Sequence, residues 1–411
     1  MKKKILSGIF ILLVCAGIYS YRTNVLVAKE REDSFYKELD IFAQALAVIE
    51  EKYVEEKPPQ DLIYGALSGL LSSLDSYSEF LTPDNYKDLL VETEGKFGGL
   101  GIEITVKDTL LTIVSPIEDT PAWNAGIKPG DIIVKIEGKI TRGITISEAV
   151  KKLRGEPGTK VTLTVLRDKD KKIEDVTIER AIIKIKDIKN AEILEGGIGY
   201  IRITEFRENT AKELDKGLQA LKAAGLKGLI VDVRNNPGGL LETAIEVTSR
   251  FLDDGKVIVS TKGRTEKEVI YVSLKLKEKY TNIPMVVLIN KGSASASEIL
   301  ASALRDNKRA ILVGEVSFGK GSVQTIVPLS DNSALRLTTS RYYTPSGLSI
   351  HEKGVEPDIV VVAENNSQGP KEDVFENLEK KNEFNYKKDN CIVRAVDLLK
   401  GIMVLSDNKS Q

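Results

Sequence analysis

Short, largely apolar runs alternate with amphipathic stretches between residues 197 and about 306. The apolar runs cover Ile198–Ile203, Leu229–Val233 and Met285–Ile289. Amphipathic patterns follow them at Thr210–Ala224, at Leu240–Leu252 and from about Ser295 onward. Strands that are apolar on both faces are typical of parallel sheets, because crossover helices cover both faces of such a sheet. This pattern therefore predicts an α/β layer with a largely parallel sheet.

The chain before this segment contains two other kinds of structure. From 35 to about 90, two stripes of apolar residues at a spacing of three or four predict amphipathic helices, interrupted at Pro58-Pro59. The stripes comprise Leu39, Phe42, Leu46, Ile49 and Tyr53, then Leu62, Ile63, Ala66, Leu67, Leu70, Leu71 and Leu74. From 95 to 182, alternation such as Ile102, Ile104 and Val106 predicts β-strands. A capping box from Thr145 to Glu148 opens a short helix there.

The N-terminus begins with basic residues that precede an apolar run. Lys2, Lys3 and Lys4 are followed by apolar residues from Ile5 to about Tyr21. This order is typical of a secretory signal or an N-terminal anchor, and the length of the run lies between the two. We expect an exported protein that residues 5–21 anchor to the extracytoplasmic face of the cell membrane, or a periplasmic protein if the signal is cleaved. A buried core helix is the remaining alternative.

Scarce residue types exclude several kinds of chemistry. The 411 residues include one histidine, His351, and two cysteines, Cys15 and Cys391. A zinc site of the Cys₄, Cys₂His₂ or His₃ type cannot form, and a disulfide framework is excluded because Cys15 lies in the apolar run. Any Ser-His-Asp mechanism would depend on His351. Lys and Arg total 59 against 60 for Asp and Glu, which argues against an unspecific nucleic-acid binder.

A glycine-rich loop stands directly before one alternating strand. Gly98-Gly-Leu-Gly101-Ile102 lets successive backbone N–H groups turn toward one point, where they can hold a carboxylate. Together with Pro121–Asp131 and the Arg154–Gly158 turn, this loop makes residues 95–182 resemble a PDZ domain of the circularly arranged bacterial type. The resemblance implies binding of a free protein C-terminus, with its carboxylate on the backbone of Leu100, Gly101 and Ile102. A glycine hairpin in an ordinary β domain is the alternative.

Three segments of the α/β region carry groups suited to chemistry. Asp232–Gly239 ends in two glycines whose N–H groups can receive an anion, although a tight β-to-α turn also explains them. Lys291–Glu298 places serines before a helix, where one can be a nucleophile on an elbow, but Ser295 and Glu298 also form a capping box. Gly314–Gln324 sets Lys320 between glycines, where a dry pocket makes an amine a base, although loop lysines are normally solvated.

The last of these segments also nearly spells a phosphate-binding P-loop. The fit fails at Gly321, where a Ser or Thr hydroxyl would bind magnesium. Val323–Leu329 then reads as a strand, whereas a P-loop requires a helix. A nucleotide hydrolase is therefore disfavoured.

Taken together, these motifs resemble the carboxy-terminal processing peptidases, also called tail-specific proteases. The resemblance covers about residues 40–362 and implies a multi-domain α+β chain with a crotonase- or ClpP-like α/β core, an inserted PDZ domain and flanking helical segments. It rests on Ser293–Glu298, Phe318–Gln324, Arg234–Gly239, Leu74–Leu81, Tyr343–Gly347, Gly354 and Pro357-Asp358. We expect a signal or anchor at 1–28, a helical region at 29–94, the PDZ domain at 95–182, the peptidase core at 183–362, and a polar linker with a final helix at 363–411.

The resemblance also implies a reaction and its residues. Ser295 would be the nucleophile, Lys320, 25 residues later, the base, and Gln324 the residue that orients the lysine. Ala296, with Gly238 or Gly239, would supply the N–H groups of an oxyanion hole. Peptide bonds would be hydrolysed through an acyl-enzyme without a metal or cofactor. His351 matches no catalytic position, so we expect it to be structural or incidental.

Partners and regulation follow from the same resemblance. We expect protein or peptide substrates with free C-termini and no nucleic acid, while an adaptor protein stays an open option. Apolar helices before Gly95 and after Asn390 suggest a homodimer. Arg154 aligns with a family position near the interface between PDZ domain and catalytic core, which makes it a candidate regulatory residue. A catalytically inactive PDZ scaffold on the same fold is the alternative to an active peptidase.

Overall fold

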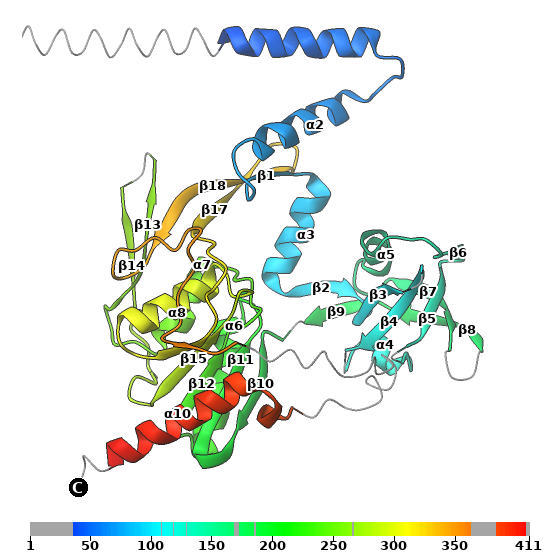
Figure 1. Ribbon diagram of the computed structural model, residues 1–411. Helices are drawn as coiled ribbons and strands as arrows, with labels where there is room; N and C mark the ends of the chain where they lie inside the picture. Colours follow the sequence, from blue (N-terminus) through cyan, green and yellow to red (C-terminus); the bar gives the residue numbers. More distant parts are fainter. Residues whose placement is uncertain are drawn as a thin grey trace, which may run out of the picture. The chain divides into compact units, whose positions relative to one another are not determined.

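The computed structural model describes residues 36–107, 109–117, 119–128, 130–167, 172–184, 186–264, 267–362 and 384–407 (Figure 1). The chain divides into two compact units, of which the first ends at Phe80 and the second begins at Leu81. The predicted signal or anchor at 5–21 lies outside the described residues. No helix in the described ranges combines the length and apolar character needed to cross a membrane.

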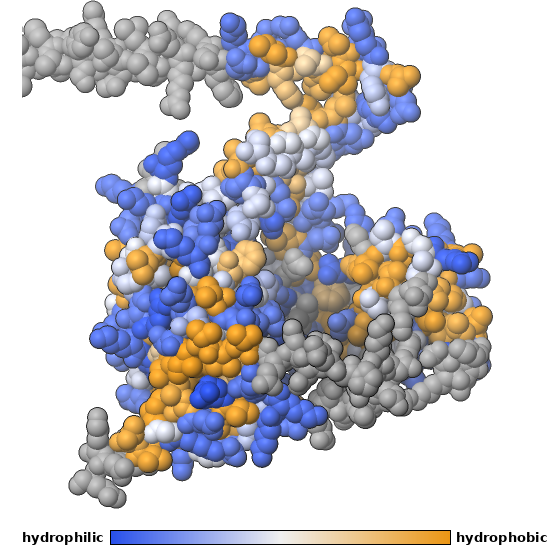
Figure 2. All heavy atoms as spheres, viewed as in Figure 1, coloured by the Kyte–Doolittle hydropathy of each residue, from blue (hydrophilic) through white to orange (hydrophobic). Residues whose placement is uncertain are grey.

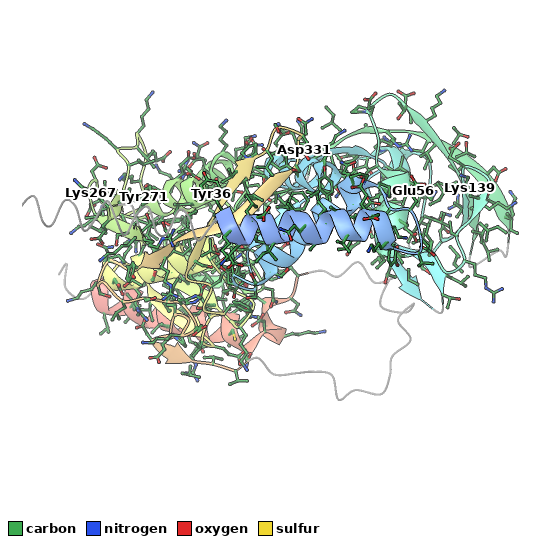
Figure 3. All side chains as sticks on the ribbon, turned by 90° about the horizontal axis from the view of Figure 1, so that it is seen from above. Tyr36, Glu56, Lys139, Lys267, Tyr271 and Asp331 are labelled. Atoms are coloured by element: carbon green, nitrogen blue, oxygen red, sulfur yellow. The ribbon has the colours of Figure 1, made fainter. Side chains whose placement is uncertain are left out.

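The first unit is helical over most of its described length. A helix covers 36–52, and α2 (Pro59–Ser72) follows the predicted break at the two prolines. Pro59 occupies the first turn of α2, where the N–H that proline lacks would have no helical partner. The predicted stripe on the first helix is largely exposed, at Leu39, Phe42, Ile49 and Tyr53. Figure 3 shows this helix between the labels Tyr36 and Glu56, and Figure 2 shows hydrophobic residues along it.

A short strand and a third helix follow. These are β1 (Glu79–Leu81) and α3 (Pro83–Glu94). The sequence pattern predicts helical structure up to about residue 90 and misses β1, whose three residues are too few to establish an alternating pattern.

Residues 96–184 form a small β domain around its own core. β3 (Ile102–Lys107), β4 (Leu110–Pro116), β5 (Ile132–Ile136), β7 (Lys160–Leu166) and β8 (Ile173–Glu179) pair in this order, and all pairs are antiparallel. β6 (Lys139–Ile140) pairs with β5, and β2 (Lys96–Gly99) pairs with β9 (Ala181–Lys184). The predicted capping box at Thr145 starts α5 (Ile146–Leu153), and α4 (Pro121–Asn124) is the other helix described here. Among the described strands β3 pairs with β4 alone, so its other edge is open.

The predicted parallel sheet is confirmed in the following segment. Its strands are β10 (Ile188–Ile193), β11 (Ile198–Ile203), β12 (Gly228–Asp232), β15 (Met285–Ile289), β16 (Ile311–Gly314) and β19 (Ile359–Val360), in this order. All neighbours from β11 to β19 are parallel, and β10 joins antiparallel after the 3₁₀ turn Glu195–Gly197 has reversed the chain. The carboxyl ends of the parallel strands therefore meet at one edge, where ligands bind in such sheets.

Helices cover both faces of this sheet, which explains why its central strands β12 and β15 are buried and largely apolar. On one face α6 (Thr210–Ala223), α7 (Leu241–Ser249) and α8 (Ala296–Asp306) pack in one hydrophobic cluster with the side chains of Ile201, Val231 and Val287. On the other face α10 (Asn390–Asp407) buries Ile392, Val396 and Leu399 against Tyr200, Ile230 and Val286. The predicted final helix is therefore present, whereas most of the predicted linker, 363–383, lies outside the described residues.

A second sheet belongs to the same unit. β17 (Ser322–Pro328), β18 (Ala334–Tyr343), β13 (Val257–Gly263) and β14 (Val269–Val272) pair antiparallel in this order. Tyr271, labelled in Figure 3, lies on β14. The predicted strand at Val323–Leu329 corresponds to β17, which begins two residues after Lys320.

Candidate active site

Ser295 lies on a sharp turn between β15 and α8. Its backbone has φ 53° and ψ −113°, a conformation that costs a residue with a Cβ atom on the order of 1–3 kcal/mol. The next residue, Ala296, begins α8, so the first free N–H groups of that helix lie beside the serine. A strained serine between a strand and a helix has the geometry of a nucleophile elbow.

The hydroxyls of the two neighbouring serines, Ser293 and Ser297, form structural hydrogen bonds. The Ser293 hydroxyl donates to the carbonyl oxygen of Val233 at 2.8 Å, and the Ser297 hydroxyl donates to that of Asn236 at 3.0 Å. Both side chains are fully buried. These bonds tie the serine loop to the turn after β12. Ser295 is therefore the one of the three serines whose hydroxyl takes no part in these two structural hydrogen bonds.

The glycine turn after β12 lies directly against Ser295. A Cβ atom on Gly238 would lie 2.7 Å from the Cβ of Ser295 and 2.9 Å from the backbone nitrogen of Ala296. The buried Asn236 joins the two loops, because its carbonyl oxygen accepts the N–H of Ala294 at 3.0 Å. Gly238 and Gly239 have φ values of 108° and 136°, which only glycine adopts without strain. The structure thus brings together Ser295, Ala296 and Gly238, and Gly239 is the next residue of the same turn.

The loop that carries Lys320 is bound to the same serine turn through one carboxylate. Glu298 accepts the N–H of Ser295 at 2.8 Å, that of Gly319 at 2.7 Å and that of Lys320 at 2.9 Å, together with the Ser317 hydroxyl. Its side chain is fully buried, and burial raises the pKa of Glu298 by more than these four hydrogen bonds lower it. Sequence reasoning assigns Glu298 only to a helix cap. The capping spacing was the available signal, and it reveals nothing about the lysine loop.

Gln324 lies on β17, at an irregularity in its pairing with β18. The shift in register falls between Val323 and Gln324. Its side-chain amide nitrogen donates to the hydroxyls of Ser322 at 2.8 Å and Thr338 at 3.4 Å. Because the amide nitrogen of Gln324 makes these bonds, its side-chain carbonyl oxygen can accept a hydrogen bond from another donor.

Tyr342 is a second residue that sequence reasoning does not identify. It is buried on β18, and its N–H donates to the carbonyl oxygen of Gly321 at 2.8 Å, next to Lys320. Burial raises the pKa of its hydroxyl to about 12, while an interaction with the Ser295 side chain acts in the opposite direction. Tyr342 therefore contacts the serine and the lysine loop together, and its phenol is neutral at ordinary pH.

His351 lies beside the lysine loop as well. A Cβ atom on Gly321 would lie 2.5 Å from the backbone nitrogen of His351, so the two segments pack closely. The Nδ1 atom of His351 is buried and has no hydrogen-bond partner within the described residues. Its expected structural role stays a prediction. In the same ranges no three His, Cys, Asp or Glu residues form a group that would hold a metal ion.

The predicted peptide-binding loop lies between β2 and the open strand β3. The carbonyl oxygen of Leu100 accepts the N–H of Ala122 at 2.9 Å, and that of Gly101 accepts the N–H of Ile117 at 2.8 Å. With these carbonyls bound to the domain, the N–H groups of the loop face away from those partners. Gly101 has φ 77°, and a Cβ atom there would lie 2.3 Å from Thr120, so glycine is required. The backbone therefore suits a carboxylate that enters along β3.

Arg154 ends α5 at the edge of a cavity of about 430 Å³ that Phe97 and Asp88 also line. Its guanidinium carbon lies 4.7 Å from the centre of the Phe97 ring, and a nitrogen lies 3.7 Å from the Asp88 carboxylate. The side chains of Arg154 and Asp88 are 32% and 55% exposed, and ion pairs with such exposure are weak.

Comparison with known proteins agrees with this architecture. Residues 197–361 match peptidase family S41, residues 112–167 match the PDZ domain, and residues 18–84 match the N-terminal domain of the activating protease CtpB. The carboxy-terminal-processing protease of Bartonella bacilliformis is 45% identical over 359 residues, which are 85% of this chain and 82% of that protein. The carboxy-terminal processing protease CtpA of Bacillus subtilis is 37% identical over 87% of this chain and 77% of that protein. A solved protein of Bacteroides fragilis assigned to the S41 proteases shares the fold, with a TM-score of 0.54 and 17% identity over 87% of this chain and 97% of that one.

The fold and these matches define a serine-type endopeptidase of family S41 that carries a PDZ domain. Within that class, the chain belongs to the carboxy-terminal processing proteases, at 45% identity over most of its length. The mixed α/β fold class predicted from the sequence is thereby confirmed, as are the family and the enzyme class.

Proposed function

We propose that this protein is an exported peptidase that captures the C-terminus of a protein substrate on its PDZ domain and cleaves near that end with Ser295 and Lys320. One observation carries the proposal. The strained Ser295 and Lys320 donate their backbone N–H groups to the same buried carboxylate of Glu298, at 2.8 and 2.9 Å. An arrangement that fixes a serine and a lysine relative to each other suits a Ser-Lys dyad better than a scaffold that only binds.

The proposed reaction has two stages. The neutral amine of Lys320 takes the proton of the Ser295 hydroxyl, and Oγ attacks the carbonyl carbon of the scissile bond. The resulting ammonium returns the proton to the leaving nitrogen as the C–N bond breaks, which gives an acyl-enzyme and frees the C-terminal fragment. Water, activated by the same amine, then hydrolyses the ester. The carbonyl oxygen of Gln324 orients the lysine by accepting a hydrogen bond from it.

The oxyanion hole consists of the N–H groups of Ala296 and one glycine of the turn after β12. Gly238 donates its N–H to the side-chain oxygen of Asn236 at 2.9 Å, within its own turn. Gly239 is therefore the better donor to the substrate oxyanion. Removing one such donor costs on the order of 10²–10³ in kcat.

The PDZ domain supplies specificity for the end of the chain. We propose that the substrate adds a strand to β3 and that its carboxylate binds the N–H groups of Leu100, Gly101 and Ile102. The charge of that carboxylate attracts the Arg154 guanidinium, which a weak pair with Asp88 and the face of the Phe97 ring hold in place. Repositioning of Arg154 would then signal occupancy of the groove to the catalytic core.

Export, anchoring and assembly complete the proposal. The basic and apolar order of residues 2–21 supports export with an uncleaved anchor, and periplasmic release if the segment is a cleaved signal. The exposed apolar stripe on the helix 36–52 supports a homodimer. The match to the CtpB N-terminal domain over 18–84 is compatible with an adaptor protein that binds to this part of the chain.

A cleavage assay tests the proposal against the alternative of an inactive scaffold. The exported part of the chain is incubated with a protein that ends in an apolar tail, and mass spectrometry identifies the products. We expect cuts near the C-terminus with the wild type, none with Ser295→Ala, and slower cutting when the tail is amidated. Binding of the tail without any product in the wild type would establish the scaffold instead.

A further inference from the structure

The C-terminal helix α10 lies outside the segment that matches the peptidase family, which ends at residue 361. It nevertheless covers one face of the catalytic sheet and reaches the edge where the strands end. Its first turn meets the turn after β12, the turn that carries both proposed oxyanion glycines. The contact is made by Asp389, directly before the helix, and by Arg234.

Asp389 binds in two directions. Its Oδ1 atom accepts the N–H groups of Cys391 and Ile392 at 3.0 and 3.2 Å, which caps the free end of α10. The same carboxylate accepts both terminal nitrogens of Arg234, at 3.1 and 2.8 Å. Burial raises the pKa of Asp389, but the hydrogen bonds and charge of Arg234 outweigh burial and hold the pKa below its usual range. Asp389 is thus a charged partner of Arg234 throughout the neutral range.

The guanidinium of Arg234 lies between Asp389 and a second carboxylate. Its Nε donates to Asp232 at 3.0 Å and one terminal nitrogen does so at 2.6 Å, while Asp232 also accepts the Tyr200 hydroxyl at 2.8 Å. Asp232 ends β12 and belongs to the rigid sheet. Asp389 is therefore the second partner that positions the two terminal nitrogens of the guanidinium.

A cavity beside this pair makes the second partner consequential. A cavity of about 190 Å³ is lined by Arg234, Asp389, Asn235, Asn290 and Cys391. Protein interiors are otherwise close-packed, and packing alone fixes most buried side chains. Here the cavity gives the guanidinium room to move, so the two bonds to Asp389 select its position.

The position of Arg234 is passed on to the site through consecutive residues. Asn235 and Asn290 exchange hydrogen bonds of 2.9 Å, and the carbonyl oxygen of Asn236 accepts the N–H of Ala294. Gly238 and Gly239 follow after Pro237. A shift at Arg234 would therefore displace the turn that we assign to the oxyanion hole.

We propose that Asp389 is a positioning residue for catalysis, which sets the oxyanion turn from behind through Arg234 and makes α10 part of the catalytic machinery. This inference rests on the proposed function of Ser295 and of the glycine turn. Asp389 touches neither substrate nor reacting atoms. Its effect should therefore appear in kcat and leave KM unchanged.

The test uses the whole chain with Asp389→Asn, which keeps a good helix cap but loses the charge. The matched control is Asp397→Asn, an exposed position on the same helix. We expect kcat on a peptide with a free apolar C-terminus to fall between roughly 10- and 100-fold with KM within twofold. The rate at which a fluorophosphonate modifies Ser295 should fall by the same factor, because that reaction needs the oxyanion turn and no tail. Asp389→Glu should restore most of both rates.

Measurement well below the midpoint of thermal unfolding separates positioning from stability. A folded Asp389→Asn protein with the kcat and labelling rate of the Asp397→Asn control would overturn the inference, and so would a change confined to KM. If Asp389→Asn does not fold, Asp389→Ser keeps a capping oxygen and is judged by the same criteria. Full activity of Ser295→Ala would instead refute the proposed function itself.

Discussion

The serine loop of the catalytic core and the groove of the PDZ domain hold their functional groups by opposite means. Around Ser295 the polar side chains of Ser293, Ser297, Asn236 and Glu298 are fully buried, and each is hydrogen-bonded to a neighbouring loop. In the groove, β3 offers an open edge, and a partly exposed ion pair of 3.7 Å holds Arg154. Buried, satisfied networks fix atoms within a fraction of an ångström, whereas weak exposed contacts exchange readily for those of a ligand.

The difference agrees with what each region has to do. A dyad needs its serine and lysine in one geometry for every substrate, because misplacement by about 1 Å can cost 10²-fold in rate. A groove that receives many chain ends gains from backbone contacts that ignore side chains. Substitutions in the core should therefore act on kcat by large factors, and substitutions in the groove should act on KM or on regulation by small ones.

The largest effect is expected at the base. Lys320→Ala removes the group that takes the serine proton, and we expect kcat to fall by roughly 10⁴-fold or more. His351→Ala removes a side chain that packs near the same loop but takes no proton in the proposed reaction, so it should keep most activity. Steady-state cleavage of a peptide with a free C-terminus measures both. An inactive His351→Ala protein beside an active Lys320→Ala protein would contradict the Ser-Lys assignment.

Glu298→Gln tests whether one carboxylate truly organises both partners. The amide presents an NH₂ group to donors that need an acceptor, so the bonds to Ser295 and Lys320 cannot all be kept. We expect kcat to fall about 10²–10³-fold and the free energy of unfolding to fall by about 2–3 kcal/mol. Kinetics and urea unfolding supply the two numbers.

The control for that variant is Glu246→Gln on the exposed side of α7. It should change neither kcat nor stability measurably. If Glu298→Gln behaved like this control, the buried carboxylate would have no part in positioning, and the contrast between a rigid core and an adaptable groove would lose its main support.

Much of the fold is predictable because it depends on local sequence. The parallel strands are recognisable since both faces of their sheet are covered, and Pro58-Pro59 breaks the helical pattern because Pro59 can only begin a new helix. The capping box at Thr145 and the strand after Lys320 depend on a few neighbouring residues as well. β1 escapes prediction because a strand of three residues is fixed by its surroundings.

The site is less predictable because its decisive contacts join distant residues. Without the family resemblance, the local pattern does not separate Ser295 from Ser293 and Ser297, since all three follow the same strand. In the structure, the strained backbone of Ser295 and the hydrogen bonds of the other two serines distinguish them. The spacing of Glu298 indicates a cap but not its bonds to the lysine loop. Arg234 and Asp389 are 155 residues apart, and no periodicity relates them.

In the groove, Gly101→Ala should weaken tail binding without harming the core. Alanine disfavours φ 77°, and its Cβ atom would collide with Thr120 at 2.3 Å, so the carboxylate loop must shift. With Ser295→Ala as background, so that the peptide is not cut, we expect calorimetry to show an affinity for an apolar C-terminal peptide about tenfold lower. Gly138→Ala has a similar φ of 73° but open space around the Cβ position, which makes it the matched control. Equal affinities in the two variants would exclude the loop as the carboxylate site.

The smallest expected effect tests whether the groove communicates with the core. Arg154→Ala removes a partly exposed ion pair and a contact with the Phe97 ring, so stability should change by no more than about 1 kcal/mol. The informative quantity is the ratio of kcat/KM for a free-carboxylate peptide to that for its amidated form. If a bound carboxylate acts through Arg154, this ratio should fall a few-fold in Arg154→Ala and stay unchanged in Lys152→Ala, an exposed neighbour on α5. An unchanged ratio in both variants would mean that the groove only tethers the substrate. Arg154 would then have no part in transmitting the binding of a C-terminus to the catalytic core.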